Sequence, residues 1–338
     1  MLDIVQMIRR NSNILTKLLP FLSFVIPFFV LYSLYPDSFE ITWKGRTYQL
    51  FFLWLFLLET ILNWEESQAR KISKLKSART ITFIITLLIP TIYVIVANLC
   101  GLNHMIQNLA DQYNIPQANV MPLSTEYLVF AVLFVVIILL IYGIKGLMGY
   151  SISMFFLGII GAVYTIDNIY PQGSFTPFQI LVPTTAILAA NVLNIMGYQT
   201  EWTGEYLGTP VLKAWNSNGK AEFGIAWPCS GIESLLIYTV TILLFLKKDL
   251  TPWKQKIIYF AIGAIVTYFI NVSRIATIFM IAINDGPHAA LRFHDYYGQL
   301  YSITWIISYP LIIIGSRVLW GKIRDWKTGV KDVSTSLR

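Results

Sequence analysis

Three residues in the last third of the chain carry side chains that together suit acyl transfer. Cys229 supplies a thiol, Arg274 a permanent positive charge and His294 an imidazole. In acyl transfer a thiolate attacks a carbonyl carbon, a cation stabilises the oxyanion that forms, and an imidazole carries the proton to the leaving amine. The three residues can do this chemistry only if the fold brings them to one place.

The sequence around Cys229 favours a reactive thiol. Residues 198–228 are polar and rich in turn formers, whereas Gly231 to Leu246 is an apolar run. Cys229 is therefore predicted at a boundary between water and membrane, close to a helix N-terminus whose partial positive charge favours the thiolate. The alternative interpretation of a lone cysteine is a small buried hydrophobic residue.

Arg274 and His294 also lie within or beside apolar runs, where polar side chains usually have a specific role. Arg274 interrupts the apolar run from Ile257 to Ile283, where a charge is costly and usually marks a functional interior or a buried partner. His294 directly precedes the last apolar run, so it too is expected at a boundary. The alternative for Arg274 is a structural contact with a neighbouring polar group that holds the helices together.

Three short blocks, in order along the last third of the chain, resemble the exosortase/archaeosortase family of integral-membrane cysteine transpeptidases. They are Cys229-Ser230-Gly231-Ile232 with Ser234, Asn271-x-x-Arg274, and His294-x-x-x-Gly298. The resemblance implies that Cys229, Arg274 and His294 are catalytic and that Ser230, Gly231, Asn271 and Gly298 support them. Some archaeal members have a second arginine at the position of His294, so this chain is more similar to the exosortase pattern.

The resemblance also implies a function and a substrate class. A protein of this kind cleaves the C-terminal sorting signals of exported proteins, which consist of a short motif, a hydrophobic helix and a basic end. Cleavage through a thioester would transfer the new C-terminus to an amine acceptor on a membrane lipid or another envelope component, or to water. No metal and no other cofactor is implied.

Composition places the whole chain in a membrane. Of its 338 residues 56% are hydrophobic and only 13% are charged, with a mean hydropathy of +0.60, which excludes an ordinary soluble domain. Apolar runs of about twenty residues can cross the hydrocarbon as helices. The sequence therefore predicts an all-α polytopic protein with about eight transmembrane helices, near 14–35, 47–64, 80–99, 125–145, 147–166, 230–246, 256–283 and 296–318.

Basic residues predict how these helices are oriented. Lys and Arg gather in the N-terminal tail, in the loops after the second and sixth runs, and at the C-terminal end, whereas 100–124 contains none. Because such residues accumulate on cytoplasmic loops, both termini are predicted inside, and Cys229 and His294 at the outer face of the cell membrane. A weaker apolar run lies at 177–196. If it crossed the membrane, the later basic segments would lie outside, so we expect an outer interfacial or re-entrant helix there. The net charge of +7 then reflects topology and contact with anionic lipids, not nucleic-acid binding.

A small outer β-hairpin is expected directly before Cys229. Two alternating apolar segments, 211–215 and 221–227, flank Asn216-Ser217-Asn218-Gly219, and Asn-Gly between such segments is a strong hairpin signal. An edge strand there could hold an extended peptide by backbone pairing, or the hairpin is only a connector. We expect one integral-membrane domain over 1–338, with a four-helix part (14–145), a middle part (146–228), catalytic helices (229–320) and a cytoplasmic tail (321–338).

Other polar residues support weaker interpretations. Glu59 lies within the second run, where snorkelling or a hydrogen bond between helices explains it as well as a function does. Cys100 is the other cysteine, and pairing it with Cys229 would block the predicted nucleophile. His288 and His294 with nearby Asp285 and Asp295 match no common zinc spacing. The main alternative function is a transporter or lipid-binding membrane protein that holds an anion at Arg274.

The predicted orientation can be tested with reporter fusions. A reporter fused after residue 205 should read as extracytoplasmic, and one fused after residue 250 as cytoplasmic, because the basic loops stay inside. The reverse pair of signals would mean that 177–196 is a true span and that Cys229 faces the other side.

Overall fold

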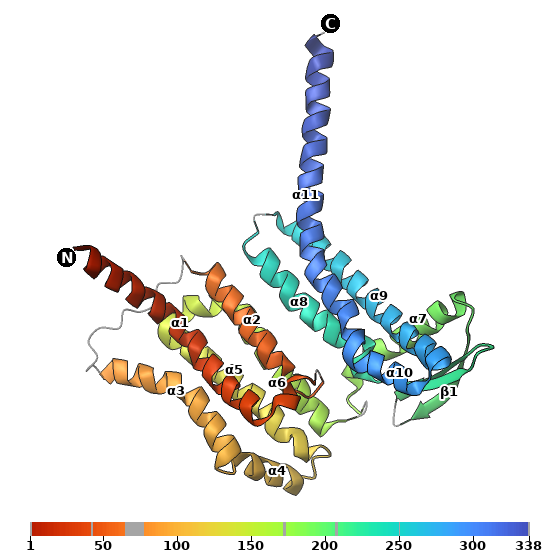
Figure 1. Ribbon diagram of the computed structural model, residues 1–338, viewed down its shortest axis with the longest axis horizontal. Coiled ribbons are helices and arrows are strands. Elements are labelled where there is room, and N and C mark those ends of the chain that lie inside the picture. Colours follow the sequence, from red (N-terminus) through yellow and green to blue (C-terminus); the bar gives the residue numbers. More distant parts are fainter. Residues whose placement is uncertain are drawn as a thin grey trace. The chain divides into compact units, whose positions relative to one another are not determined.

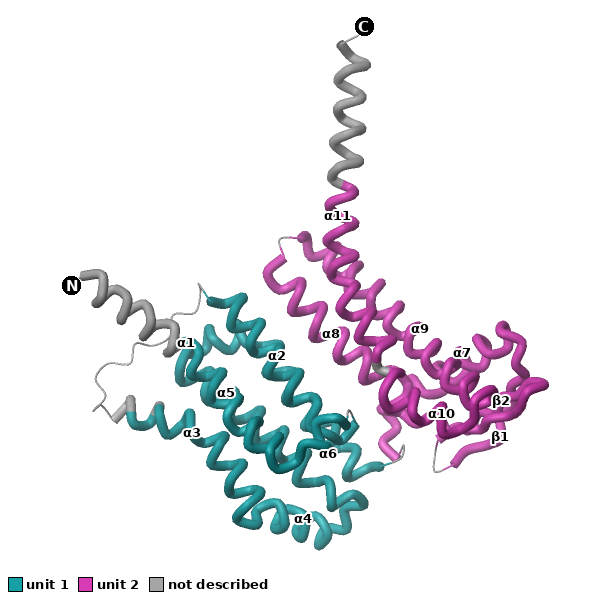
Figure 2. Tube along the Cα trace, viewed as in Figure 1, with its two compact units in different colours: residues 1–171 teal, residues 172–338 magenta. Residues whose placement is uncertain are grey.

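The computed structural model describes residues 2–41, 43–64, 78–171, 174–206, 209–249 and 251–336. The chain divides into two compact units, residues 1–171 and 172–338 (Figure 2). The basic loop predicted after the second apolar run falls mostly on 65–77, which lies outside the described residues. That the units form one integral-membrane domain with the expected internal boundaries stays a prediction.

The first unit is built from helices, because apolar chain in a bilayer must satisfy its backbone N–H and C=O groups internally. Its helices, shown in Figure 1, are α1 (Leu2–Leu34), η1 (Pro36–Phe39), α2 (Thr47–Leu62), α3 (Ala78–Leu99), α4 (Leu102–Gln112), η2 (Ala118–Val120), α5 (Met121–Gly149) and α6 (Ser151–Ile169). Non-helical Gly143, at φ 72°, interrupts α5 near its end.

Phenylalanine rings fill the centre of the first unit. Phe28 of α1 meets Phe130 of α5 edge-on with ring centroids 4.9 Å apart, and Phe56 of α2 meets Phe134 of α5 at the same distance. All four side chains are at most 2% exposed. Edge-to-face packing of this kind adds to the burial energy, so these aromatic contacts help to hold α1, α2 and α5 together.

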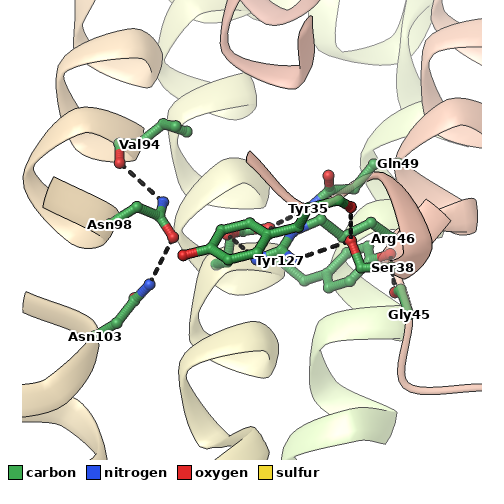
Figure 3. Close-up of polar contacts among 10 residues, drawn as sticks. Tyr35, Ser38, Gly45, Arg46, Gln49, Val94, Asn98, Asn103 and Tyr127 are labelled. Carbon is green, nitrogen blue, oxygen red and sulfur yellow. Dashed lines mark hydrogen bonds and ion pairs between the residues drawn. The ribbon is translucent and has the colours of Figure 1, made fainter. Parts of the chain in front are cut away.

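A buried ion pair ties the start of α2 to α5. The guanidinium of Arg46 donates to both carboxylate oxygens of Glu126 at 2.9 and 3.0 Å, and Gln49 also donates to Glu126 at 2.5 Å. Figure 3 shows Arg46 and Gln49 together with Ser38, whose hydroxyl accepts a further hydrogen bond from Arg46 at 3.2 Å. Burial alone would lower the pKa of Arg46, but the charge and hydrogen bonds of Glu126 raise it above its usual value. The bidentate geometry offsets the cost of removing both charges from water.

Two further carboxylates of this unit have structural roles. Glu59, fully buried in α2, accepts hydrogen bonds from the backbone N–H groups of Ile152 and Ser153 at 3.2 and 2.9 Å. It therefore caps the N-terminus of α6, which agrees with one of the interpretations left open for Glu59, a hydrogen bond between helices. Asp167, near the end of α6, is buried and pairs with Lys44 at 2.6 Å.

The second unit combines helices with a small sheet (Figure 1). Its elements are η3 (Thr176–Leu181), α7 (Val182–Ile195), β1 (Gln199–Tyr206), β2 (Thr209–Trp215), β3 (Lys220–Gly224), η4 (Trp227–Ser230), α8 (Ile232–Lys247), α9 (Trp253–Asp285), α10 (Pro287–Arg292), the π-helix η5 (Phe293–Tyr297) and α11 (Gly298–Ser336).

The predicted hairpin is confirmed as β2 and β3, and the sheet contains a further strand. The strands are antiparallel in the order β1-β2-β3, with Leu212 of β2 opposite both Trp202 and Phe223. Inward-facing Leu212 and Ala221 pack on buried residues of α7 and α9, among them Ala186 and Phe279. The sheet is thus attached to the C-terminal half of α9.

The all-α membrane fold is confirmed, but the count of eight spans is not. By length and composition six described helices can cross a membrane, or seven if the pair Ile84–Leu99 and Leu102–Gln112, bent by 67°, is one span. Helices α2 and α8 have only 16 residues each, about 24 Å at 1.5 Å per residue, so they fall short of the hydrocarbon thickness. Residues 176–195 are among the six, so an interfacial position for this helix stays a prediction.

The ion pair of the first unit gives a stability prediction. Glu126→Ala leaves Arg46 buried without its anion and should lower the free energy of unfolding by about 3–5 kcal/mol. Asp111→Ala, at an exposed position of α4, is the matched control and should change little. Thermal unfolding in detergent measures both, and equal melting temperatures for the two variants would contradict a stabilising role for the pair.

Candidate active site

Cys229 lies in a short turn that ends where α8 begins. Ala226 is extended, Pro228 is in the first positions of the η4 turn, and the N–H of Cys229 donates to the carbonyl of Ala226 at 2.9 Å. Gly231 then adopts φ 96°, a left-handed conformation that favours glycine, and α8 starts at the next residue. The first N–H groups of α8 have no partner within the helix, so Cys229 lies next to a positive helix end, as the sequence predicted.

Side chains from two other helices hold this turn. Asn271 of α9 donates from Nδ2 to the carbonyl of Cys229 at 2.8 Å. Thr185 of α7 donates to the carbonyl of Ser230 at 2.9 Å, and its hydroxyl is also 2.8 Å from the hydroxyl of Tyr268. Ser230 is fully buried and bonds back to the carbonyl of Trp227 at 2.7 Å. The position of the thiol is thus set by hydrogen bonds to the backbone on either side of it.

His294 faces the thiol from the π-helix η5. Its Nε2 is 3.7 Å from Sγ of Cys229, and its Nδ1 is 2.9 Å from Oδ1 of Asp295. If Nδ1–H donates to the carboxylate, the lone pair of Nε2 points at the thiol and can accept its proton. A π-helix widens the turn locally and is frequent at functional sites. Here it lies between α10 and α11 and carries His294.

Arg274 is a buried cation beside the same π-helix. It is 5% exposed, and its Nε has no hydrogen-bond partner among the described residues. A Cβ added to Gly298, the first residue of α11, would lie 2.7 Å from this nitrogen. Arg274 is also within electrostatic reach of His294. The charge of Arg274 therefore lies close to His294, because the first residue of α11 is a glycine that leaves room for the guanidinium.

The two glycines of the sequence blocks make room for neighbouring polar side chains. Gly298 leaves space for Arg274, and a Cβ on Gly231 would lie 3.1 Å from Nδ2 of Asn271. Asn271 and Arg274 are three positions apart on α9, so both project from one face, and both are buried. With the Asn-x-x-Arg spacing, Asn271 contacts the turn that contains Cys229, and Arg274 lies beside the segment that contains His294.

All seven residues singled out from the sequence lie in the second unit, around this turn. Their catalytic and supporting roles stay predictions. Sequence reasoning missed Thr185 and Tyr268, for which the local sequence has no signal, because the contacts of Thr185 with Ser230 and with Tyr268 arise from tertiary packing. It also missed the contact of Asp295 with His294, although its place next to the histidine was a usable signal.

Neither Cys229 nor His294 lines an open cavity that lies next to η5. This cavity, of about 510 Å³, is lined by Ala289, Arg292, Phe293, Tyr296 and Tyr297. These positions follow helical spacing along one face of α10 and η5, whereas His294 shares a different face with Ala290 and Gly298. Among the described residues no group of three or more His, Cys, Asp and Glu side chains could hold a metal ion.

Comparison with known proteins gives a family match. The family described as "Transmembrane exosortase" matches residues 42–309, a range that contains the cysteine, arginine and histidine blocks. No curated protein and no solved structure matches the chain.

The geometry predicts different reactivity for the two free cysteines. Cys229 is half-buried and Cys100 is exposed, yet Cys229 should react faster with a polar alkylating reagent because His294 can accept its proton. Mass spectrometry of tryptic peptides over time measures both rates in one sample. His294→Ala should slow Cys229 and leave Cys100 unchanged, and faster labelling of Cys100 in the unaltered protein would contradict the assignment.

Proposed function

This chain belongs to the transmembrane exosortase family, and on that basis we propose that it is a membrane cysteine protease and transpeptidase. The family acts on exported proteins with C-terminal sorting signals, and the proposed reaction is cleavage at such a signal. The observation that carries the proposal is the 3.7 Å approach of His294 Nε2 to Cys229 Sγ, with Asp295 at the other ring nitrogen.

The proposed first step forms a thioester. His294 takes the thiol proton, and the sulfur of Cys229 attacks the carbonyl carbon of the scissile peptide bond. The tetrahedral oxyanion then collapses, the C–N bond breaks, and the proton on His294 passes to the leaving amine. The acyl part of the substrate stays bound to Cys229 as a thioester, and the sorting helix is released with a new N-terminus.

Arg274 is proposed to stabilise the negative charge of this step. Its Nε lacks a hydrogen-bond partner among the described residues although the side chain is buried, so no donor has to be freed before it binds an oxyanion or thiolate. The N-terminus of α8 adds a second positive end. Fixed donors in surroundings that exclude water stabilise a developing charge far more than water does.

The proposed second step depends on the acceptor. An amine attacks the thioester carbonyl and loses a proton to His294, a new amide bond forms, the C–S bond breaks, and the leaving thiolate of Cys229 takes the proton back from His294. A membrane lipid or another envelope component supplies this amine, and water in its place gives a free carboxylate. The site is proposed to face the outside of the cell membrane with both termini cytoplasmic, where the sorting signal of an exported protein arrives.

The experiment that tests this function compares variants in cells. Cys229→Ala and Cys229→Ser should make exported proteins with C-terminal sorting signals accumulate uncleaved, and mass spectrometry identifies these precursors. With such a precursor and purified protein, Arg274→Lys should cleave on the order of a hundredfold more slowly, because lysine has a different reach and lacks the planar fork. Cys100→Ala is the matched control and should cleave normally.

Folding has to be separated from catalysis in this comparison. The melting temperature in detergent and the amount of protein in the membrane should be unchanged for Cys229→Ser and Arg274→Lys. An unstable Arg274→Lys that turns over normally per folded molecule would remove Arg274 from the mechanism. Full cleavage by Cys229→Ser would overturn the assignment of Cys229 as the nucleophile.

A further inference from the structure

We propose that the free edge of β3 binds the extended stretch of substrate polypeptide directly upstream of the scissile bond. The bound segment would add to the sheet as a further strand, held by backbone hydrogen bonds. This inference rests on the proposed function, and it names the part of the protein that aligns the substrate with Cys229.

The hydrogen-bond pattern of the hairpin shows which backbone groups of β3 are available. Ile225 N–H donates to the carbonyl of Pro210, and Asn216 N–H donates to that of Gly219, both at 3.0 Å. Because bonding alternates along an antiparallel pair, the odd-numbered residues 219–225 face β2 and the even-numbered ones face away. Lys220, Glu222 and Gly224 therefore direct N–H and C=O groups to the free edge, where no backbone hydrogen bond to a described residue is present.

The other edge of the sheet is less suited to pairing. In β1 the register shifts between Trp202 and Gly204, and Gly204 has φ 130°, so a bulge interrupts the edge. Bulges are a common device that prevents further strands from adding to an edge. In β3 the register with β2 is regular from Lys220 to Gly224.

The β3 edge leads directly to the nucleophile. After Gly224 the chain stays extended through Ala226 and then enters the turn that contains Cys229. Contacts with α9 occur at both ends of this path. A Cβ on Gly219 would lie 2.9 Å from the carbonyl oxygen of Ile283, and Asn271 bonds to Cys229. A peptide on the edge would thus run along the end of α9 toward the site.

The path also determines the direction of the bound segment. The sorting helix follows the scissile bond and has to enter the membrane alongside helices such as α8 and α9. The sheet packs on the C-terminal half of α9. It can therefore bind the substrate residues that precede the scissile bond. These residues run toward Cys229, as β3 does, and the proposed pairing is parallel. Recognition through the backbone would tolerate different side chains upstream of the sorting motif.

Substrates with single ester bonds test the pairing without altering the protein. The parent is an all-amide peptide that spans the cleavage site of a precursor that accumulates with Cys229→Ala. Four variants each replace one amide N–H by oxygen, at consecutive positions upstream of the scissile residue. Every second variant should lose about five- to tenfold in kcat/KM, because only alternate N–H groups face β3.

A variant pair in the protein gives an independent readout. Glu222→Pro removes an N–H that faces the free edge and makes no bond to β2. The fold should be kept, because edge strands accept proline at such positions, and kcat/KM should fall about tenfold, because the substrate loses one hydrogen-bond donor. Glu222→Ala keeps the N–H, loses the contact of the carboxylate with Thr203 and should cleave like the unaltered protein. The alkylation rate of Cys229 reports whether each variant keeps its site, and if Glu222→Pro loses it, the ester series decides.

The outcomes separate this inference from the proposed function. If the parent peptide is cleaved and the four esters react equally, the pairing is overturned and the protease function stands. Equal rates for an intact Glu222→Pro and Glu222→Ala would likewise overturn the pairing alone. A parent peptide that the unaltered protein does not cleave overturns the proposed function, and the pairing with it.

Discussion

The hydrogen bond from Asn271 to the carbonyl of Cys229 is the contact on which the candidate site depends. It joins two chain segments that are 42 residues apart, at 2.8 Å. Through it α9 holds the turn before α8, and three positions further along the same helix presents Arg274 to the segment of His294. The glycine at 231 lets the turn approach this closely. A thiol and a cation from different helices thereby acquire a fixed relation.

Among the described residues, two kinds of charged side chain lie inside the fold. The buried Glu59, Glu126 and Asp167 of the first unit, and the partly buried Arg46 and Lys44, all have hydrogen-bonded or ionic partners, as expected for charges that stabilise a fold. The Nε of Arg274 has none among the described residues. An incompletely paired buried cation is costly, so its presence next to a thiol and an imidazole favours a reactive role over a structural one.

The sheet explains how an irregular, polar segment can stand beside a nucleophile in a helical protein. Its inner face is apolar and packs on α7 and α9, and its outer residues are exposed. Within a helix the backbone N–H and C=O groups bond to each other, so only the helix ends offer backbone groups for recognition. A strand edge offers them along its length, and in this protein the strand nearest the turn of Cys229 has a regular edge.

The sequence by itself determined the membrane class, the helical runs, the β2–β3 hairpin and the three blocks around Cys229, Arg274 and His294. These features depend on local composition and spacing, which do not depend on how distant segments pack together. Only the tertiary structure revealed the strand β1, the capping role of Glu59, the burial of Asp167 and the contacts of Thr185 and Asp295. It also left the predicted count of eight spans unconfirmed, because α2 and α8 have only 16 residues each. Such features arise from which distant segments pack together and how each side chain is oriented, and neither is written in the spacing of residues along the chain.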